Sequence, residues 1–319
     1  MVAIDVKELS KSWGKTLAVD NISFQVKEGE VFGFLGPNGA GKTTTIKMLV
    51  GLTKPTSGSA YVSGYNIVEE PREVKKRIGV VPESSNLYDE LSISQNLRFV
   101  SKLYHISSIR REQRIQKVLD TFQLNEYSNR RFAKLSKGLK RRTILAAALL
   151  HEPQIVFLDE PTSGLDVLSA RNLRQVILEL TESGVTIFLT THYIEEAGQL
   201  CDRIALLVKG RIVEVDTPEA LRDIVQDTPL LKISIANEQR LAPDDLQGIQ
   251  AENIMLSHGE ISILTQDIQG ALSRVMEIAT EKKITIHDIQ TVKPGLEDAF
   301  IQLTGLSLES MRMEKEGKR

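Results

Sequence analysis

Short apolar runs separated by polar turns dominate the first two thirds of the chain, and this pattern predicts alternating strands and helices. The runs expected to form buried strands lie at residues 21–26, 31–35, 155–158 and 186–190. Strands and helices in alternation favour an α/β fold, in which a mixed or parallel sheet is covered by helices.

A helical region is expected to begin at Ser92. Ser92 and Gln95 have the spacing of a capping box, in which two side chains satisfy backbone N–H groups at the start of a helix. Apolar residues then recur on one helical face, at Leu97, Val100, Leu103 and Tyr104. We therefore expect a helical subdomain at about residues 86–150.

Beyond Pro218 the predicted elements follow a different order. They are a strand at 230–235, a short helix at 241–246, a hairpin around His258 and Gly259, a helix at 268–282, a strand at 284–292 and a helix at 296–303. This order predicts a small α+β unit of a βαββαβ-like type.

The length of 319 residues and the apolar content of 41% predict two domains, each with its own core. We place an α/β domain at 1–216, a linker at 217–228, a small α+β domain at 229–305 and a charged tail at 306–319.

Composition narrows the functional classes. The 40 basic and 42 acidic residues leave a net charge of −2, which argues against a general nucleic-acid-binding surface, so we expect no nucleic-acid partner. The single cysteine, Cys201, and the lack of a secretory signal in residues 1–5 predict a reducing cytosol. Apolar runs are too short to cross a bilayer, so any membrane role requires a partner.

A phosphate-binding loop is predicted at residues 36–43. The stretch fits the pattern G-x-x-x-x-G-K-[ST] and lies between the strand at 31–35 and a helix at 44–50. Its glycines allow backbone N–H groups to surround phosphates, Lys42 supplies a positive charge, and the hydroxyl of Thr43 can bind Mg²⁺. The simpler interpretation is a glycine-rich turn without a ligand.

Two carboxylates, Asp159 and Glu160, follow the apolar run at 155–158. A buried strand that ends in acids places them where α/β sheets bind ligands. Asp159 is suited to hold Mg²⁺ through water, and Glu160 to act as a general base toward an attacking water. Without the phosphate loop, ordinary solvated acids would be the better interpretation.

Five ordered motifs resemble those of ATP-binding cassette (ABC) ATPases, over roughly residues 2–216. The stretch at 158–166 resembles the Walker B and D-loop run, and 135–142 resembles the signature sequence L-S-G-G-Q. Residues 81–83 stand at the Q-loop, His192 at the switch histidine, and Trp13 at the aromatic residue that stacks on adenine. The implied fold is a P-loop NTPase domain of the ABC type with a helical subdomain.

The resemblance implies that the chain hydrolyses ATP, with Glu160 and His192 as catalytic residues and with Mg²⁺ held by Thr43, Asp159 and Glu83. The implied nucleotide contacts are Trp13, Gly36, Pro37, Asn38, Gly39, Ala40, Gly41, Lys42, Thr43, Thr44, Glu83, Ser136, Gly138 and Asp166.

In the family, the signature sequence contacts ATP bound to the opposite subunit, which implies a homodimer with ATP sandwiched at the interface. Three of the implied contacts have simpler interpretations. Ser136 can be a plain helix N-cap, His192 a packed or solvent-facing imidazole, and Trp13 a core residue.

Two departures from the family pattern concern metal binding and the coupling of ATP hydrolysis to transport. Lys137 and Leu139 replace a glycine and a glutamine of the signature sequence, and Glu83 replaces the glutamine of the Q-loop. Ser136 and Gly138 are kept, so γ-phosphate recognition is retained. A carboxylate at position 83 can still approach Mg²⁺ but adds a negative charge.

Such departures are familiar in exporter-type cassettes, and the stretch at 294–300 resembles the end of ABC-2-type cassettes for drugs, lipids, polysaccharides or sodium. For the residues of that stretch we prefer the simpler interpretation, a helix whose Leu296, Phe300 and Leu303 pack the small domain. The resemblance implies a separate membrane permease, a place at the cytoplasmic face of the cell membrane and a prokaryotic origin. It also implies that Leu87 and Tyr88 help to receive a helix of the permease, unless they pack onto the cassette core. Two other functions stay open: remodelling of ribosomes or DNA by a soluble cassette, and phosphotransfer that uses the phosphate loop alone.

Overall fold

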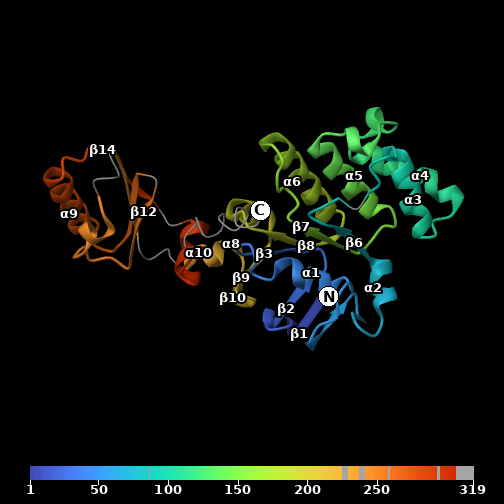
Figure 1. Cartoon of the computed structure of the whole chain (residues 1–319), viewed down its shortest axis with the longest axis horizontal. Helices are drawn as coiled ribbons and strands as arrows, with labels where there is room; N and C mark the ends of the chain where they lie inside the picture. Colours follow the sequence, from blue (N-terminus) through green and yellow to red (C-terminus); the bar gives the residue numbers. More distant parts are fainter. Residues whose placement is uncertain (86, 225–228, 237–240, 258, 293–294, 307–319) are drawn as a thin grey trace. The chain divides into compact units, whose positions relative to one another are not determined.

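The computed structural model describes residues 1–85, 87–224, 229–236, 241–257, 259–292 and 295–306. The chain divides into two compact units, residues 1–218 and residues 219–305 (Figure 1). The division falls within the stretch 217–228, where a linker is predicted from sequence. That stretch begins with a helix, α8 (Pro218–Asp223).

A six-stranded sheet forms the centre of the first unit, in the order β10-β9-β3-β8-β7-β6. Five of its strands are parallel and β10 is antiparallel to β9. The bounds are β3 (Val31–Leu35), β6 (Ile78–Val81), β7 (Ile155–Asp159), β8 (Thr186–Thr191), β9 (Arg203–Val208) and β10 (Arg211–Asp216). Strands β3, β7 and β8 are buried at every position, as expected for a parallel sheet covered on both faces.

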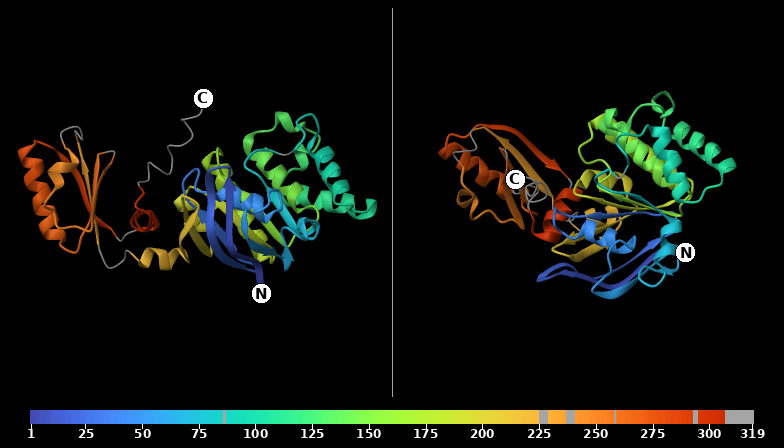
Figure 2. Two further views of the ribbon diagram at one scale, coloured as in Figure 1. Left: turned by 60° about the horizontal axis from the view of Figure 1, so that its bottom comes forward. Right: turned by 45° about the vertical axis from the view of Figure 1, so that its right-hand side comes forward.

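An antiparallel sheet of order β2-β1-β4-β5 completes the strands of this unit (Figure 2). Its strands are β1 (Val2–Trp13), β2 (Thr16–Lys27), β4 (Ser57–Val62) and β5 (Tyr65–Asn66). Strand β2 begins five residues before the predicted strand at 21–26, because its first half pairs with the end of β1 in a tight hairpin, where Trp13 faces Thr16.

The two sheets share one hydrophobic core with helix α1 (Lys42–Leu49). Phe24 from the antiparallel sheet and Phe32, Phe34 and Phe188 from the parallel sheet form a cluster with ring centroids 5.0–6.0 Å apart. This packing holds the strand that precedes the phosphate loop.

The remaining helices of the first unit include three that follow one another in the stretch predicted to be helical. These are α3 (Ile93–Leu103), α4 (Ser108–Thr121) and α5 (Lys137–Leu149). The capping box at Ser92 and Gln95 is confirmed, with both side-chain hydrogen bonds made. The other helices are α2 (Pro71–Arg77), α6 (Val167–Glu182) and α7 (Ile194–Leu200), and short 3₁₀ turns lie at Asn125–Tyr127 and Phe132–Lys134.

The second unit is a four-stranded antiparallel sheet of order β12-β13-β11-β14 between two helices. Its elements are β11 (Leu230–Ile235), a 3₁₀ turn (Pro243–Leu246), β12 (Asn253–Ser257), β13 (Glu260–Leu264), α9 (Ile268–Glu281), β14 (Ile286–Val292) and α10 (Leu296–Thr304). The order agrees with the predicted α+β unit, although the predicted short helix is the 3₁₀ turn. His258, around which a hairpin is predicted, lies outside the described residues.

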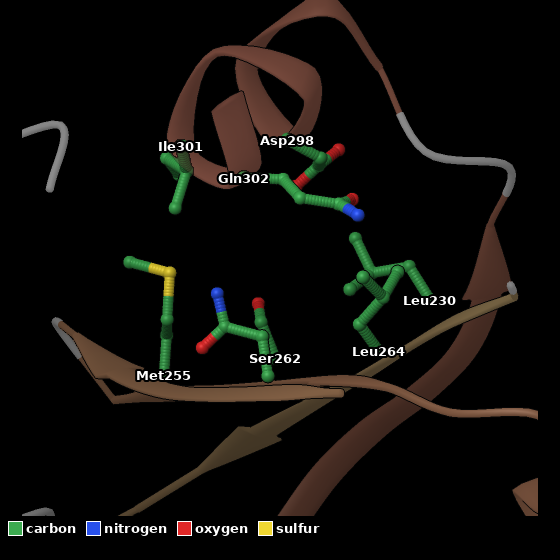
Figure 3. Close-up of a pocket in the computed structure, with 8 residues that line it drawn as sticks. Leu230, Met255, Ser262, Leu264, Asp298, Ile301 and Gln302 are labelled. Atoms are coloured by element: carbon green, nitrogen blue, oxygen red, sulfur yellow. The ribbon is translucent and has the colours of Figure 1, made fainter. Parts of the chain in front are cut away.

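Helix α9 packs on one face of this sheet and α10 on one end of the other face. Asp298, Ile301 and Gln302 of α10 face Met255 and Ser262 across a small cavity (Figure 3). Its volume of about 20 Å³ leaves room for about one water molecule, so it is too small for a nucleotide.

None of the helices among the described residues is both long enough and apolar enough to cross a membrane.

Candidate active site

The C-terminal ends of four parallel strands place the predicted catalytic groups at one edge of the central sheet. Strand β3 leads into the phosphate loop, β7 ends at Asp159, β8 precedes His192, and β6 precedes Glu83. The register aligns Leu35 with Thr191 on adjacent strands. Groups far apart in sequence therefore meet where open α/β sheets bind ligands.

Two glycines of the phosphate loop are required by its shape. A Cβ atom at Gly36 would lie 2.1 Å from the carbonyl oxygen of Leu207, and one at Gly41 would lie 2.5 Å from that of Ala18. Gly41 also has a φ of 107°, which glycine adopts readily. A backbone hydrogen bond from Gly210 N to Ala40 O, 2.9 Å long, supports the loop from the β9–β10 turn.

Lys42 is buried beneath this loop, with 5% of its surface exposed. Its Nζ donates to the carbonyl oxygens of Gly36 (2.7 Å) and Pro37 (3.1 Å) and lies 3.3 Å from Glu160 Oε1. Burial lowers the pKa of Lys42, and the nearby Glu160 opposes this effect. A buried ammonium of this kind is well placed to meet phosphate oxygens.

Asp159 lies next to Thr43, as the predicted Mg²⁺ site requires. Its Oδ1 accepts from Thr190 Oγ1 at 2.7 Å and from Thr43 Oγ1 at 3.2 Å. Burial raises the pKa of Asp159, while the two hydroxyls lower it. Thr190 was not identified from the sequence, because it appears there only as the polar end of an apolar strand.

Glu160 stands between Lys42 and the predicted switch histidine. Its Oε2 lies 2.5 Å from His192 Nδ1, and its backbone N–H is bonded to Thr190. Burial raises the pKa of this carboxyl, but His192 and Lys42 outweigh that effect and hold the pKa below its usual value. Glu160 is therefore ionised at neutral pH, as a general base must be.

The backbone of Glu160 has a φ of 49°, a conformation uncommon for residues other than glycine. Arg141 supports this segment. Its guanidinium is buried and donates to the carbonyl oxygens of Asp159, Glu160 and Pro161, and to that of Pro82. Burial lowers the pKa of Arg141 to about 10, so it stays charged at neutral pH.

Arg141 was given no role from the sequence. The run at 140–142 has three consecutive basic residues, which is typical of an exposed helix face. The one available signal is the helical spacing of position 141 with apolar Leu145 and Ala148, which are also buried.

Ser136, Gly138 and Asp166 form a separate group at the start of α5 and α6. Ser136 is the exposed N-cap of α5, and its hydroxyl accepts from Leu139 N at 3.3 Å. Asp166 caps α6 through Ser169, whose hydroxyl lies 2.7 Å from the Cβ position of Gly138. In the described part of the chain, no hydrogen bond or ion pair joins these three residues to the phosphate loop.

Trp13 ends strand β1 with 53% of its surface exposed, so it does not fill the core. Lys11 Nζ lies 4.3 Å from the centre of its ring. A half-exposed indole held from one side keeps a flat apolar surface available for stacking.

The oxygen atoms of Thr43 and Asp159 fit Mg²⁺, which commonly uses one or two protein groups together with phosphates and water. Glu83 contributes negative charge, since it opposes the lowering of the Lys42 pKa and raises that of Asp159. Within the described ranges, no group of three or more His, Cys, Asp and Glu side chains could hold a metal ion by itself. A metal here would therefore depend on the phosphates for its remaining ligands.

Comparisons with known proteins agree with this geometry. A family described as ABC transporter matches residues 19–163. The chain is 33% identical to the linearmycin resistance ATP-binding protein LnrL of Bacillus subtilis, over 96% of this chain and 99% of that protein. It is 35% identical to the Nod factor export ATP-binding protein I of Rhizobium etli, over 97% of this chain and 95% of that protein.

A solved structure of an ATP-binding subunit of an ABC transporter superposes on this chain with a TM-score of 0.64. The two are 32% identical, and the match covers 70% of this chain and 92% of that one.

Proposed function

This chain belongs to the ABC transporter family, as an ATP-binding subunit whose ATPase activity powers export. On that basis we propose a role for each site residue, a Mg²⁺ site and the partners of the chain. The observation that carries the residue roles is the position of the Glu160 carboxylate, which lies against both Lys42 and His192 at the phosphate loop.

The phosphate loop holds the ATP phosphates through its backbone N–H groups and Lys42. Nucleotide phosphates compete with Glu160 for the Lys42 ammonium, because both are anions within reach of the same Nζ. When this contact is exchanged, Glu160 becomes available to accept a proton from the attacking water. His192 orients Glu160 through the Nδ1 contact.

Thr43 and Asp159 would hold Mg²⁺, and Glu83, whose charge acts on Asp159, would supply a third oxygen. The ion supplies charge neutralisation on the phosphates when it is bound. Trp13 provides the surface on which adenine stacks.

The active unit is a homodimer that sandwiches two ATP molecules. Ser136 supports this proposal, because it is exposed at the N-terminus of α5, where backbone N–H groups favour an anion. Gly138 is buried, and its lack of a Cβ atom lets α5 approach Ser169 at the start of α6. Asp166, which caps α6 through Ser169, is exposed as Ser136 is. These groups would complete the ATP site of the partner subunit.

A membrane permease of the ABC-2 type is the proposed partner, and it would hold the chain at the cytoplasmic face of a prokaryotic cell membrane. Two relatives with nearly full-length matches support export, since their names refer to linearmycin resistance and Nod factor export. The same names favour export over remodelling of ribosomes or DNA. Phosphotransfer by the phosphate loop alone would leave the Glu160–His192 contact without a role.

The variant Glu160→Gln tests the base. The amide keeps the shape of the side chain but cannot accept the proton of the water, so turnover should fall by about a thousandfold or more while ATP binding is kept. Trapped ATP should make the variant sediment as a dimer. The exposed Glu182→Gln is the matched control, and wild-type single-turnover hydrolysis by Glu160→Gln would reject the assignment.

A further inference from the structure

A second buried acid, Glu196, lies behind the catalytic pair. It is 4% exposed and occupies the inner face of α7 together with Ile194, Ala197 and Leu200. The helical period calls for an apolar residue at this position. The adjacent Glu195 is exposed.

The Glu196 carboxylate is linked to the turn that carries His192. Its Oε2 accepts from Thr191 Oγ1 at 2.6 Å, and the same hydroxyl accepts from Tyr193 N at 3.0 Å. A hydroxyl has one proton, so its donation to Glu196 orients its lone pairs toward Tyr193. The residues on both sides of His192 are thereby held together.

The segment that follows Glu160 also reaches this carboxylate. Burial raises the pKa of Glu196, and hydrogen bonds from the hydroxyls of Thr162 and Thr191 offset part of this rise. The carbonyl oxygen of Thr162 accepts from Leu165 N at 3.1 Å, within the turn that leads to Asp166. Glu196 Oε1 itself has no hydrogen-bond partner of good geometry among the described residues.

A buried carboxylate whose hydrogen bonds come from threonine hydroxyls is costly compared with an apolar side chain, so stability does not account for an acid at this position. We propose that Glu196 is a positioning residue for hydrolysis, which orients the Thr191 hydroxyl and so holds His192 against Glu160. This inference rests on the roles proposed above for Glu160 and His192. It adds a residue that touches neither the nucleotide nor the water.

The variant Glu196→Met tests the proposal, because methionine fills a similar volume without an acceptor. We expect kcat for ATP hydrolysis to fall about tenfold or more, since small displacements of catalytic groups have effects of this size. The KM for ATP should stay within about twofold, and the melting temperature should be kept or raised. Glu196→Gln keeps one acceptor oxygen and should restore most of kcat.

Glu195→Met is the matched control on the exposed face of the same helix. A readout other than activity is the NMR signal of the histidine rings in the nucleotide-free protein. Among the five histidines, the His192 ring should shift in Glu196→Met and not in Glu195→Met. An unchanged His192 signal together with a wild-type kcat would overturn the proposal, and so would a kcat that falls only in step with the melting temperature.

Thr191 provides a second pair of variants in case Glu196→Met does not fold. Thr191→Val removes the hydroxyl with little change of shape and should lower kcat as Glu196→Met does. Thr191→Ser keeps the hydroxyl, so its kcat should be close to that of the wild type. Equal kcat values in these two variants would contradict the proposal.

The background His192→Ala separates this inference from the proposed function. If Glu196 acts through His192, Glu196→Met should add less than about a twofold effect in that background. A full additional effect would overturn the positioning role while leaving His192 catalytic. Wild-type activity of His192→Ala alone would instead show that the proposed function of His192 is wrong.

Discussion

Charged side chains at the nucleotide site are buried next to one another. Lys42, Asp159 and Glu160 are each less than a tenth exposed. Buried charges are costly unless each is paired, and here pairing is uneven. Glu160 lies against the Lys42 ammonium and the His192 imidazole, whereas Asp159 is held by the hydroxyls of Thr43 and Thr190.

Removing the charge of Asp159 should therefore stabilise the nucleotide-free protein. Asn at position 159 can still accept from Thr190 and Thr43 without the desolvation cost of a carboxylate. We expect Asp159→Asn to raise the melting temperature by about 2 °C or more, and to abolish Mg²⁺-dependent hydrolysis. Differential scanning calorimetry without nucleotide checks the first effect and an ATPase assay the second.

The stabilisation should depend on pH. Burial raises the pKa of Asp159 in the folded chain, so the folded state binds its proton more tightly than the unfolded state does. Wild-type stability therefore falls, relative to the variant, as pH rises through the folded pKa. At about pH 3 and below, where Asp159 is protonated in both states, the two proteins should melt alike. A difference that grows toward low pH would contradict this explanation.

Helix α5 joins the predicted signature sequence to the ends of two strands. Arg141 on this helix donates to the carbonyl oxygens of Asp159 and Glu160 at the end of β7, and to that of Pro82 after β6. One side chain therefore satisfies carbonyl groups that have little access to water.

We expect Arg141→Met to lower the free energy of unfolding by about 2–5 kcal/mol, because it leaves these carbonyl groups unpaired. Arg142→Met, on the less buried neighbour, is the matched control and should change it by about 0.5 kcal/mol or less. Urea unfolding followed by circular dichroism measures both. Equal effects of the two substitutions would show that the carbonyl contacts have no special importance.

The loop before α3 is a second element with a testable role. Leu87 is half-buried and Tyr88 is 51% exposed, with its ring edge-on to Phe99 at 5.0 Å. Buried Asn96 holds the loop through the backbone N–H and carbonyl of Tyr88. Because the Tyr88 ring is exposed, the observation favours a role in receiving a helix of the permease over packing onto the cassette core.

Serine at positions 87 and 88 should reduce permease-stimulated ATP hydrolysis about tenfold and leave the basal rate of the isolated subunit unchanged. Cysteines at the same positions should crosslink to the permease. The exposed Ile109→Ser, on α4, serves as the control. Absence of crosslinks from both positions, with full stimulation in both serine variants, would count against this surface.

Local motifs explain how much of this site could be predicted from the sequence. Gly36, Gly41 and Lys42 each meet a separate physical demand within a few residues, so their pattern is recognisable without a structure. The contacts of Glu160 with Lys42 and His192 depend instead on the strand order β3-β8-β7, which no local pattern encodes. Arg141 and Glu196 were missed for a related reason, since only tertiary packing shows that these charged residues are buried.

At the scale of the whole molecule, the second unit has its own core and its own sheet. The residues proposed to bind the nucleotide all lie in the first unit. We expect a chain that ends at Pro218 to bind ATP with an affinity within about threefold of the full chain, and residues 219–305 to unfold cooperatively when expressed alone. Calorimetric ATP titration and thermal unfolding test the two halves of this prediction. A folded but non-binding cassette would show that the second unit contributes to the site.

The position of β3 in the central sheet has a consequence for synthesis on the ribosome. Its two neighbours, β8 and β9, are made about 150 and about 170 residues later, and the phosphate loop contacts Leu207 and Gly210. The phosphate loop is therefore synthesised early, but the residues that contact it are synthesised late. A nascent chain must expose its first 210 residues before the loop has its native contacts, so the cassette gains the ability to bind nucleotide almost in a single step, as its last strands emerge.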